Sequence, residues 1–160
     1  MRNITRHNEL NFKSFIERCD CDTVPKKDIK KTLNKLPKSH KDLVRGFEIN
    51  YTNGNTIEGD KKHIGTIHKR KIVVAAPWNY GREFTTLHEI AHMVWEYKVD
   101  SRMRKEWIEI AKDSMKKNKD LRDENPLELF CMAYAQHYAK NKITKFEHPK
   151  WHEFIEKIPN

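Results

Sequence analysis

Apolar and polar positions along the chain predict two short helices, then strands, then a longer helical part. Residues 8–19 and 26–36 carry apolar side chains at helical spacing, and Pro37 is expected to end or kink the second helix. Residues 47–51 alternate between apolar and polar side chains, as a half-buried strand does. Residues 64–76 predict a second strand region, because they end in a continuous apolar run.

The segment after Pro77 returns to helical spacing and contains a metal-binding motif. Its apolar face consists of Phe84, Leu87, Ala91 and Val94, and residues 88–92 read His-Glu-Ile-Ala-His. On a helix, His88 and His92 project side by side, so both imidazoles can reach one metal ion. Glu89 stands where its carboxylate can face a zinc-bound water, take its proton and leave a hydroxide to attack a carbonyl.

Chance predicts roughly 0.04 H-E-x-x-H patterns in a chain of this composition. A structural alternative is a capping box, in which Thr86 begins the helix and Glu89 serves only that helix start. This alternative leaves His92 unexplained and requires a helix that begins just before His88. The sequence therefore favours the metal site.

A catalytic zinc site needs a third protein ligand, and Glu128 is the candidate. Asn125 suits the N-cap and Pro126 the first position of a further helix, which places Glu128 in the first turn. Taken alone, Asn-x-x-Glu would be read as a capping box. The H-E-x-x-H helix shifts the prediction to ligation, with Glu124 as the fallback ligand and His137 as a weaker one.

The spacing of these motifs resembles gluzincin-type zinc metallopeptidases. H-E-x-x-H is followed by Asn-Pro-x-Glu-x-Phe-x-x-Ala-Tyr, with 35 residues between His92 and Glu128, and the combination is similar to the catalytic domain of lethal factor toxins and to Pro-Pro endopeptidases. Residues 148–155 also resemble the closing helix of that group. The resemblance implies that the zinc ligands are His88, His92 and Glu128 and that Glu89 is the general base and acid. It also implies that an extended peptide lies along the strand near residues 71–75, as an edge strand.

Two positions depart from that family. Its members usually carry an oxyanion-stabilising tyrosine seven residues before the third ligand, where this chain has Leu121. Arg122, one residue further on, is the candidate replacement, and loss of one such donor typically costs about a hundredfold in rate. The second departure is Met132, where the family often has an acidic residue that orients a ligand histidine.

A second, shorter resemblance concerns residues 82–92, which are similar to the helix entry of ImmA/IrrE-type metallopeptidases. Those proteins cleave repressors in phage and mobile-element regulation. The zinc site would be the same, and only the substrate would differ.

The net charge of +9 suggests a third hypothesis. Residues 1–80 contain 17 Lys and Arg against 9 Asp and Glu, whereas residues 81–160 contain 15 against 14. The basic first half could belong to a module that binds nucleic acid or an acidic partner and holds a structural zinc. Seven lysines between residues 26 and 41 support it, although they surround an apolar stripe as a solvated helix face would. A nucleic-acid partner is therefore not favoured.

Cysteine usage and hydropathy indicate a cytoplasmic protein. Cys19, Cys21 and Cys131 form no disulfide framework or finger-like metal spacing, so three reduced thiols are expected. No apolar run long enough for a membrane span and no secretory signal are seen.

The sequence thus predicts one α+β metallopeptidase-like domain over residues 1–160, with a small mixed sheet, an H-E-x-x-H active-site helix and a helical C-terminal subdomain. Residues 1–63 form its basic part and residues 64–160 its zinc-site core. The predicted activity is zinc-dependent hydrolysis of an internal bond in a protein or peptide substrate.

Overall fold

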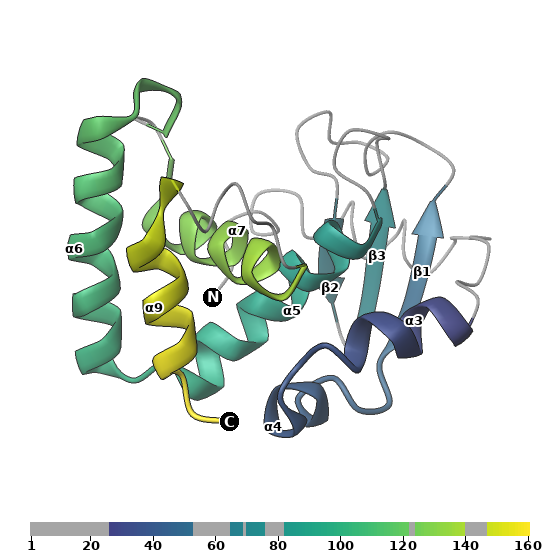
Figure 1. Cartoon of the computed structure of the whole chain (residues 1–160). Coiled ribbons are helices and arrows are strands. Elements are labelled where there is room, and N and C mark those ends of the chain that lie inside the picture. Colours follow the sequence, from purple (N-terminus) through teal and green to yellow (C-terminus); the bar gives the residue numbers. More distant parts are fainter. Residues whose placement is uncertain (1–25, 53–64, 69, 76–81, 122–123, 140–146) are drawn as a thin grey trace.

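The structure is a computed structural model that describes residues 26–52, 65–68, 70–75, 82–121, 124–139 and 147–160 (Figure 1). The elements, labelled as in Figure 1, are α3 (Lys26–Leu33), α4 (Lys38–Asp42), β1 (Glu48–Thr52), β2 (Gly65–His68), β3 (Lys71–Ala75), α5 (Arg82–Lys98), α6 (Ser101–Lys117), the 3-10 turn η1 (Lys119–Leu121), α7 (Pro126–Tyr138) and α9 (Pro149–Lys157). The helix predicted over residues 8–19 lies outside the described residues. Within the described ranges, no helix combines the length and apolar character that a membrane crossing requires.

The three strands form a small mixed sheet in the order β1-β3-β2. β1 runs parallel to β3, with Glu48 opposite Lys71, and it confirms the strand predicted over residues 47–51. β2 runs antiparallel to β3, with His68 opposite Lys71. The strand region predicted over residues 64–76 is confirmed within the described residues, where it consists of two strands that form a hairpin. Arg70 in the connection has a φ of 64°, the left-handed backbone that a tight hairpin turn requires.

The sheet order also corrects the expected position of an extended peptide. β3, which contains residues 71–75, is the central strand and is paired on both sides. A peptide adds only to a strand with an unpaired edge, so it cannot lie along β3. The continuous apolar run of β3 fits a central strand, since Ile72 and Val74 are both fully buried.

The helix predicted over residues 26–36 ends three residues earlier in the structure, ahead of Pro37. α3 ends at Leu33, and hydrogen bonds from the Lys35 and Leu36 amides to carbonyls three residues back tighten the chain into a turn. Pro37 then precedes the first residue of α4, with a ψ of 147° that is incompatible with a continuing helix. The expectation that Pro37 ends the helix is confirmed.

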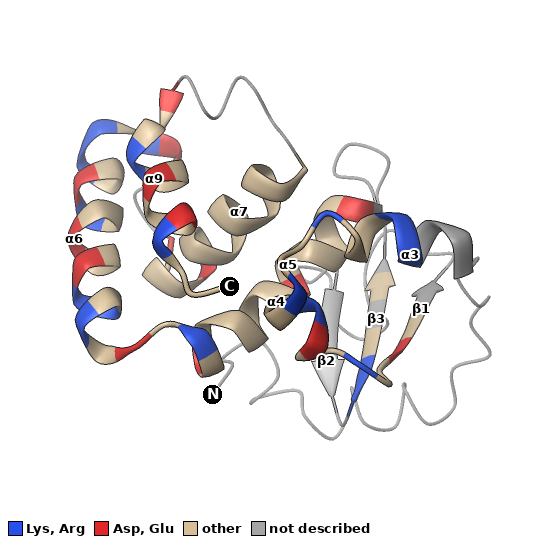
Figure 2. Cartoon of the chain, turned by 60° about the horizontal axis from the view of Figure 1, so that its bottom comes forward, with Lys and Arg blue, Asp and Glu red and all other residues tan. Residues whose placement is uncertain are grey.

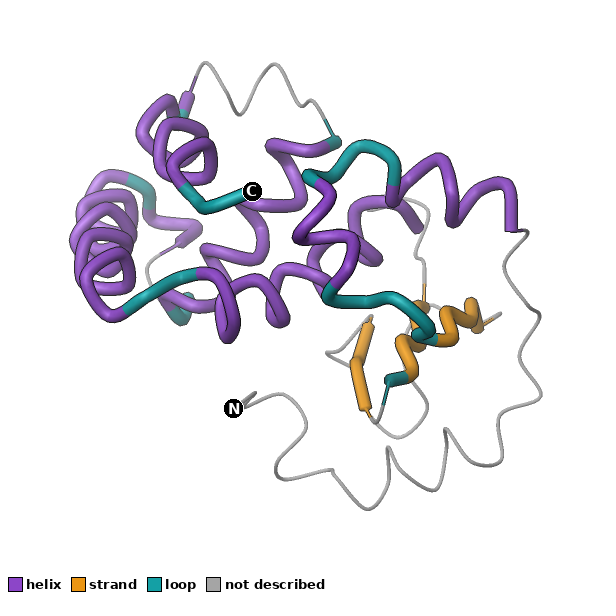
Figure 3. Tube along the Cα trace, turned by 90° about the horizontal axis from the view of Figure 1, so that it is seen from below, coloured by secondary structure: helices purple, strands orange, loops and turns teal. Residues whose placement is uncertain are grey.

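α5 joins the sheet to the helical part of the molecule. It packs against β2 and β3 on one side and against α7 on the other. Three residues of its predicted apolar face, Leu87, Ala91 and Val94, are fully buried, and Phe84 packs partly buried beside them. Figure 1 and Figure 3 both show the strands in one part of the molecule and α6, α7 and α9 beyond α5. This arrangement confirms the α+β class with a small mixed sheet.

Aromatic side chains fill the space among α6, α7 and α9. Trp107, Phe130 and Phe154 are buried with ring centroids 5.1 to 6.3 Å apart. The Trp107 indole N–H donates to the Pro126 carbonyl oxygen at 2.7 Å, which ties α6 to the first turn of α7. α9 also confirms the closing helix predicted over residues 148–155.

A buried histidine connects α4 to α7 and to the C-terminal segment. His40 is fully buried, and its Nε2 lies 2.8 Å from the Pro159 carbonyl oxygen. Because a carbonyl can only accept, Nε2 carries the proton and Nδ1 accepts from the Tyr134 hydroxyl at 2.9 Å. Burial lowers the pKa of His40, and the nearby Lys98 charge lowers it further. The neutral imidazole thus links three segments far apart in sequence.

Candidate metal centre

α5 supplies both histidines of the H-E-x-x-H motif. The helix begins at Arg82, so Thr86 lies inside it and cannot be its N-cap. The capping-box alternative for Glu89 is therefore wrong. One helical turn separates His88 from His92, and their ring centroids are 5.6 Å apart. His92 is 4% exposed and His88 is partly buried, so the pair lies at the edge of the core.

α7 presents Glu128 to these histidines. Its start is as predicted: the Asn125 side chain accepts from the Leu127 amide at 2.8 Å, and Pro126 is the first helical residue. Glu128 Oε2 lies 2.9 Å from His88 Nε2, and Glu128 Oε1 lies 3.4 Å from His92 Nε2. The fold thus brings together three side chains that are separated by up to 40 residues.

These separations fit a shared metal ion. With zinc-to-nitrogen and zinc-to-oxygen bonds of about 2.0 to 2.2 Å, tetrahedral ligand atoms lie about 3.3 Å apart. Both contacts of Glu128 are within half an ångström of that value. Two imidazoles and a carboxylate are also the donor set of many catalytic zinc sites. The same contacts suit a hydrogen-bonded His–Glu cluster, so the geometry defines a candidate site and does not identify its ion.

Cys131 also belongs to the cluster, and sequence reasoning missed it. The ligand atoms of His88, His92 and Cys131 all lie within 4.8 Å of one another, and these three residues could together hold a metal ion. Cys131 is fully buried. Its position three residues after Glu128 was the available signal, because residues three apart share one helix face. From the sequence, this thiol was expected only to be reduced.

Glu89 is buried on α5, with 2% of its surface exposed. Buried glutamates are rare because removing a carboxylate from water is costly unless the protein supplies partners. Glu89 therefore occupies a position that helix packing alone would fill with an apolar side chain. α7 also carries few charged side chains. Glu128 is its only acidic residue, and Figure 2 shows the helix almost entirely tan.

The remaining predicted positions fall outside this cluster or outside the described residues. Arg122, the proposed oxyanion donor, is not among the described residues. Leu121 and Met132 pack against the core, and Glu124 is exposed. His137 does not belong to the metal group, and its Nδ1 lies 2.9 Å from His152 Nδ1 on α9.

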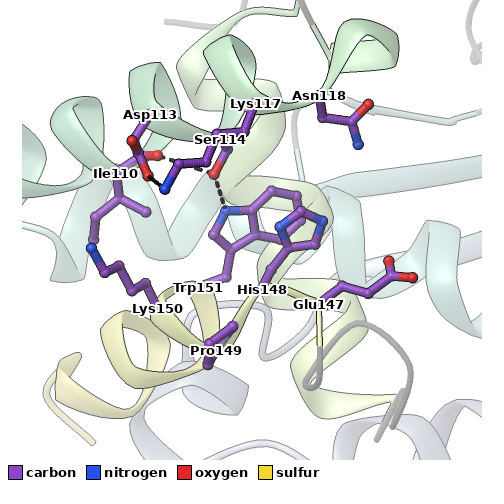
Figure 4. Close-up of a pocket in the computed structure, with 10 residues that line it drawn as sticks. All are labelled: Ile110, Asp113, Ser114, Lys117, Asn118, Glu147, His148, Pro149, Lys150 and Trp151. Carbon is purple, nitrogen blue, oxygen red and sulfur yellow. Dashed lines mark hydrogen bonds and ion pairs between the residues drawn. The ribbon is translucent and has the colours of Figure 1, made fainter.

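A separate cavity of about 500 Å³ opens between α6 and α9 (Figure 4). Two pairs of its polar groups are engaged with each other: Trp151 Nε1 donates to Ser114 Oγ at 2.9 Å, and Lys117 pairs with Asp113 at 3.0 Å. The His148 ring stacks on Trp151 with centroids 4.0 Å apart, and burial lowers the pKa of His148. None of the predicted metal ligands lines this cavity.

Compared with known proteins, the chain matches no protein-family model and no curated protein. The resemblance to gluzincins therefore stays a prediction that depends on the motifs and their spacing.

Proposed function

We propose that the protein is a zinc-dependent metalloendopeptidase of the gluzincin type, with His88, His92 and Glu128 as zinc ligands. The observation that supports this most strongly is the placement of Glu128, whose two oxygens lie 2.9 and 3.4 Å from the two histidine Nε2 atoms. This carboxylate is the only acidic side chain of a helix that begins 34 residues after His92. Ligation of one ion by all three side chains would account for its placement beside both histidines.

In this proposal each residue has a defined task. Zinc, when bound, supplies Lewis-acid polarisation of a carbonyl and lowers the pKa of water. His88, His92 and Glu128 would hold the ion. Glu89 accepts a proton from the attacking water and returns it to the departing amine, as a general base and then a general acid. Burial of Glu89 keeps bulk water from competing for that proton.

The substrate would be an extended stretch of a protein or peptide. Since β3 is paired on both sides, the peptide must lie along an edge strand. Of the two edge strands of the described sheet, β2 packs against α5, the helix that carries His88 and His92. We therefore assign the substrate to β2 in place of β3. Arg122 remains the proposed oxyanion donor.

Metal content tests the ligand assignment. Purified wild type should contain one zinc per chain by elemental analysis, and Glu128→Ala and the His88→Ala/His92→Ala double variant should lose it. Glu124→Ala is the matched control, because Glu124 is an exposed carboxylate just before the start of the same helix. Stoichiometric zinc in all the variants would overturn the site. Loss of zinc in the double histidine variant and in Glu124→Ala, with full zinc in Glu128→Ala, would move the third ligand to Glu124.

Activity tests the peptidase assignment separately. Glu89→Gln should keep its zinc but lose cleavage by about 100-fold to 10000-fold, the usual contribution of a general base. The measurement is a proteome-wide comparison of cleavage products from wild type and Glu89→Gln. Identical products from the two proteins would end the peptidase proposal even if the zinc is present. If the principal cleaved protein is a repressor, the result would favour the ImmA/IrrE-like alternative, which uses the same site.

Cys131 favours one alternative of a different class, a basic binding module with a structural metal. Structural zinc sites have four protein ligands, and the thiol lies beside the two histidines. Exposed Lys30, Lys31 and Lys38 on α3 and α4 would then contact an acidic partner. Such binding should weaken steeply with salt and should survive Glu89→Gln, whereas peptide cleavage should show neither property.

A further inference from the structure

Cys131 lies in the candidate centre itself. It follows Glu128 by three residues on α7, so both side chains leave the same helix face toward α5. Its Sγ and the ligand nitrogens of His88 and His92 are all within 4.8 Å of one another. A buried cysteine is commonly a small apolar side chain, and that role requires no imidazole beside it.

The distances allow the sulfur to share one ion with the two histidines. Zinc-to-sulfur bonds of about 2.3 Å and zinc-to-nitrogen bonds of about 2.0 to 2.1 Å place tetrahedral sulfur and nitrogen ligands about 3.5 Å apart. The span of 4.8 Å exceeds that value by little more than one ångström. Rotation of an imidazole or of the thiol covers such a difference without moving either helix.

We propose that Cys131 Sγ is a fourth protein ligand of the ion held by His88, His92 and Glu128. This inference rests on the proposed function, because it concerns the same ion. When the metal–sulfur bond forms, the S–H bond breaks and its proton goes to solvent. Cys131 then occupies the position that a catalytic zinc keeps for water or substrate. The protein rests with a closed site, and the substrate or water must displace the thiolate before hydrolysis begins.

The identity of the ligand atoms can be measured without any assay of activity. The experiment uses the Cys19→Ser/Cys21→Ser protein, in which Cys131 is the sole cysteine. X-ray absorption of its zinc form should show one sulfur at about 2.3 Å together with nitrogen and oxygen ligands at about 2.0 to 2.2 Å. The cobalt(II) form should show near-ultraviolet thiolate-to-metal charge-transfer absorption. Cys131→Ala in the same background should lose both signals and bind zinc at least about tenfold more weakly.

The outcomes distinguish failure of the proposal for Cys131 from failure of the peptidase proposal. A zinc ion with only nitrogen and oxygen ligands in the sole-cysteine protein overturns the inference about Cys131 and leaves the peptidase proposal intact. A wild-type protein that binds no zinc overturns both. Because the spectrum of the sole-cysteine protein is decisive, the test does not depend on correct folding of Cys131→Ala. If the site is closed as proposed, a folded Cys131→Ala saturated with zinc should cleave peptides faster than wild type.

Discussion

The contact between His40 and Tyr134 should make stability depend on pH in a predictable direction. Burial lowers the pKa of His40 from its ordinary value of 6.5, so the folded protein binds fewer protons than the unfolded chain below that value. The contribution of His40 is therefore fully present above pH 6.5. It declines as the pH falls below 6.5 toward the lowered pKa of the folded state, by up to about 1.4 kcal/mol per pH unit.

The size of that contribution follows from its two hydrogen bonds. His40→Phe leaves the Tyr134 hydroxyl and the Pro159 carbonyl without the partners they have at 2.9 and 2.8 Å. Each buried polar group that loses its partner costs about 1 to 3 kcal/mol. Tyr134→Phe removes only one of the two bonds, so it should cost about 1 to 3 kcal/mol. Burial raises the pKa of Tyr134 well above its ordinary value, so its hydroxyl stays protonated and remains a donor throughout.

The measurement is urea denaturation of wild type, His40→Phe and Tyr134→Phe, followed by tryptophan fluorescence at several values between pH 8 and pH 5. A metal chelator is present in every sample, because a bound ion would add its own stabilisation and its own pH dependence. The quantity compared is the difference in unfolding free energy between wild type and His40→Phe. Taking this difference cancels the pH dependence that the other histidines contribute to the unfolding free energy of both proteins.

We expect this difference to be largest at pH 8 and to shrink below pH 6.5. A difference that stays constant, or that grows as the pH falls, would refute the reasoning, since it would mean that His40 is protonated or solvated in the folded protein. A cost of less than about 0.5 kcal/mol at pH 8 would also refute it, because surface substitutions away from buried contacts usually fall in that range.

Two further predictions concern the support of the candidate centre and the connection to the sheet. Trp107→Phe keeps an aromatic ring among α6, α7 and α9 but removes the donor to the Pro126 carbonyl, so we expect a loss of about 1 to 3 kcal/mol by urea denaturation. Zinc affinity, measured by competition with a chromogenic chelator, should also fall, and an unchanged affinity would show that other contacts position Glu128. Gly46→Ala should cost about 1 to 2 kcal/mol, because Gly46 has a φ of 77° and an added Cβ would lie 2.7 Å from Arg70 Nη2. Removing that contact with Arg70→Ala should restore only part of the loss, since the strained backbone remains; full recovery would contradict the assignment to backbone strain.

Long-range pairing explains where the sequence-based predictions differed from the structure. The strand region predicted over residues 64–76 contained no turn signal that would divide it, since Lys69-Arg70 is not a usual one. The left-handed backbone at Arg70 instead permits a hairpin. The position of β3 between β1 and β2 depends on partners that no local pattern specifies. An assignment of the substrate edge therefore required the sheet itself.

The sequence by itself determined the local parts of this protein. Apolar spacing specified α5, and Asn125 with Pro126 specified the start of α7, because capping and helix periodicity depend on residues no more than four apart. Only the tertiary structure brought Glu128 to His88 and His92, and only it revealed Cys131 beside them. Both results depend on which faces of α5 and α7 pack together, and that packing is decided by burial of the whole core. The candidate centre therefore combines side chains that the motifs predicted, His88, His92 and Glu128, with their contact distances and a cysteine that only packing revealed.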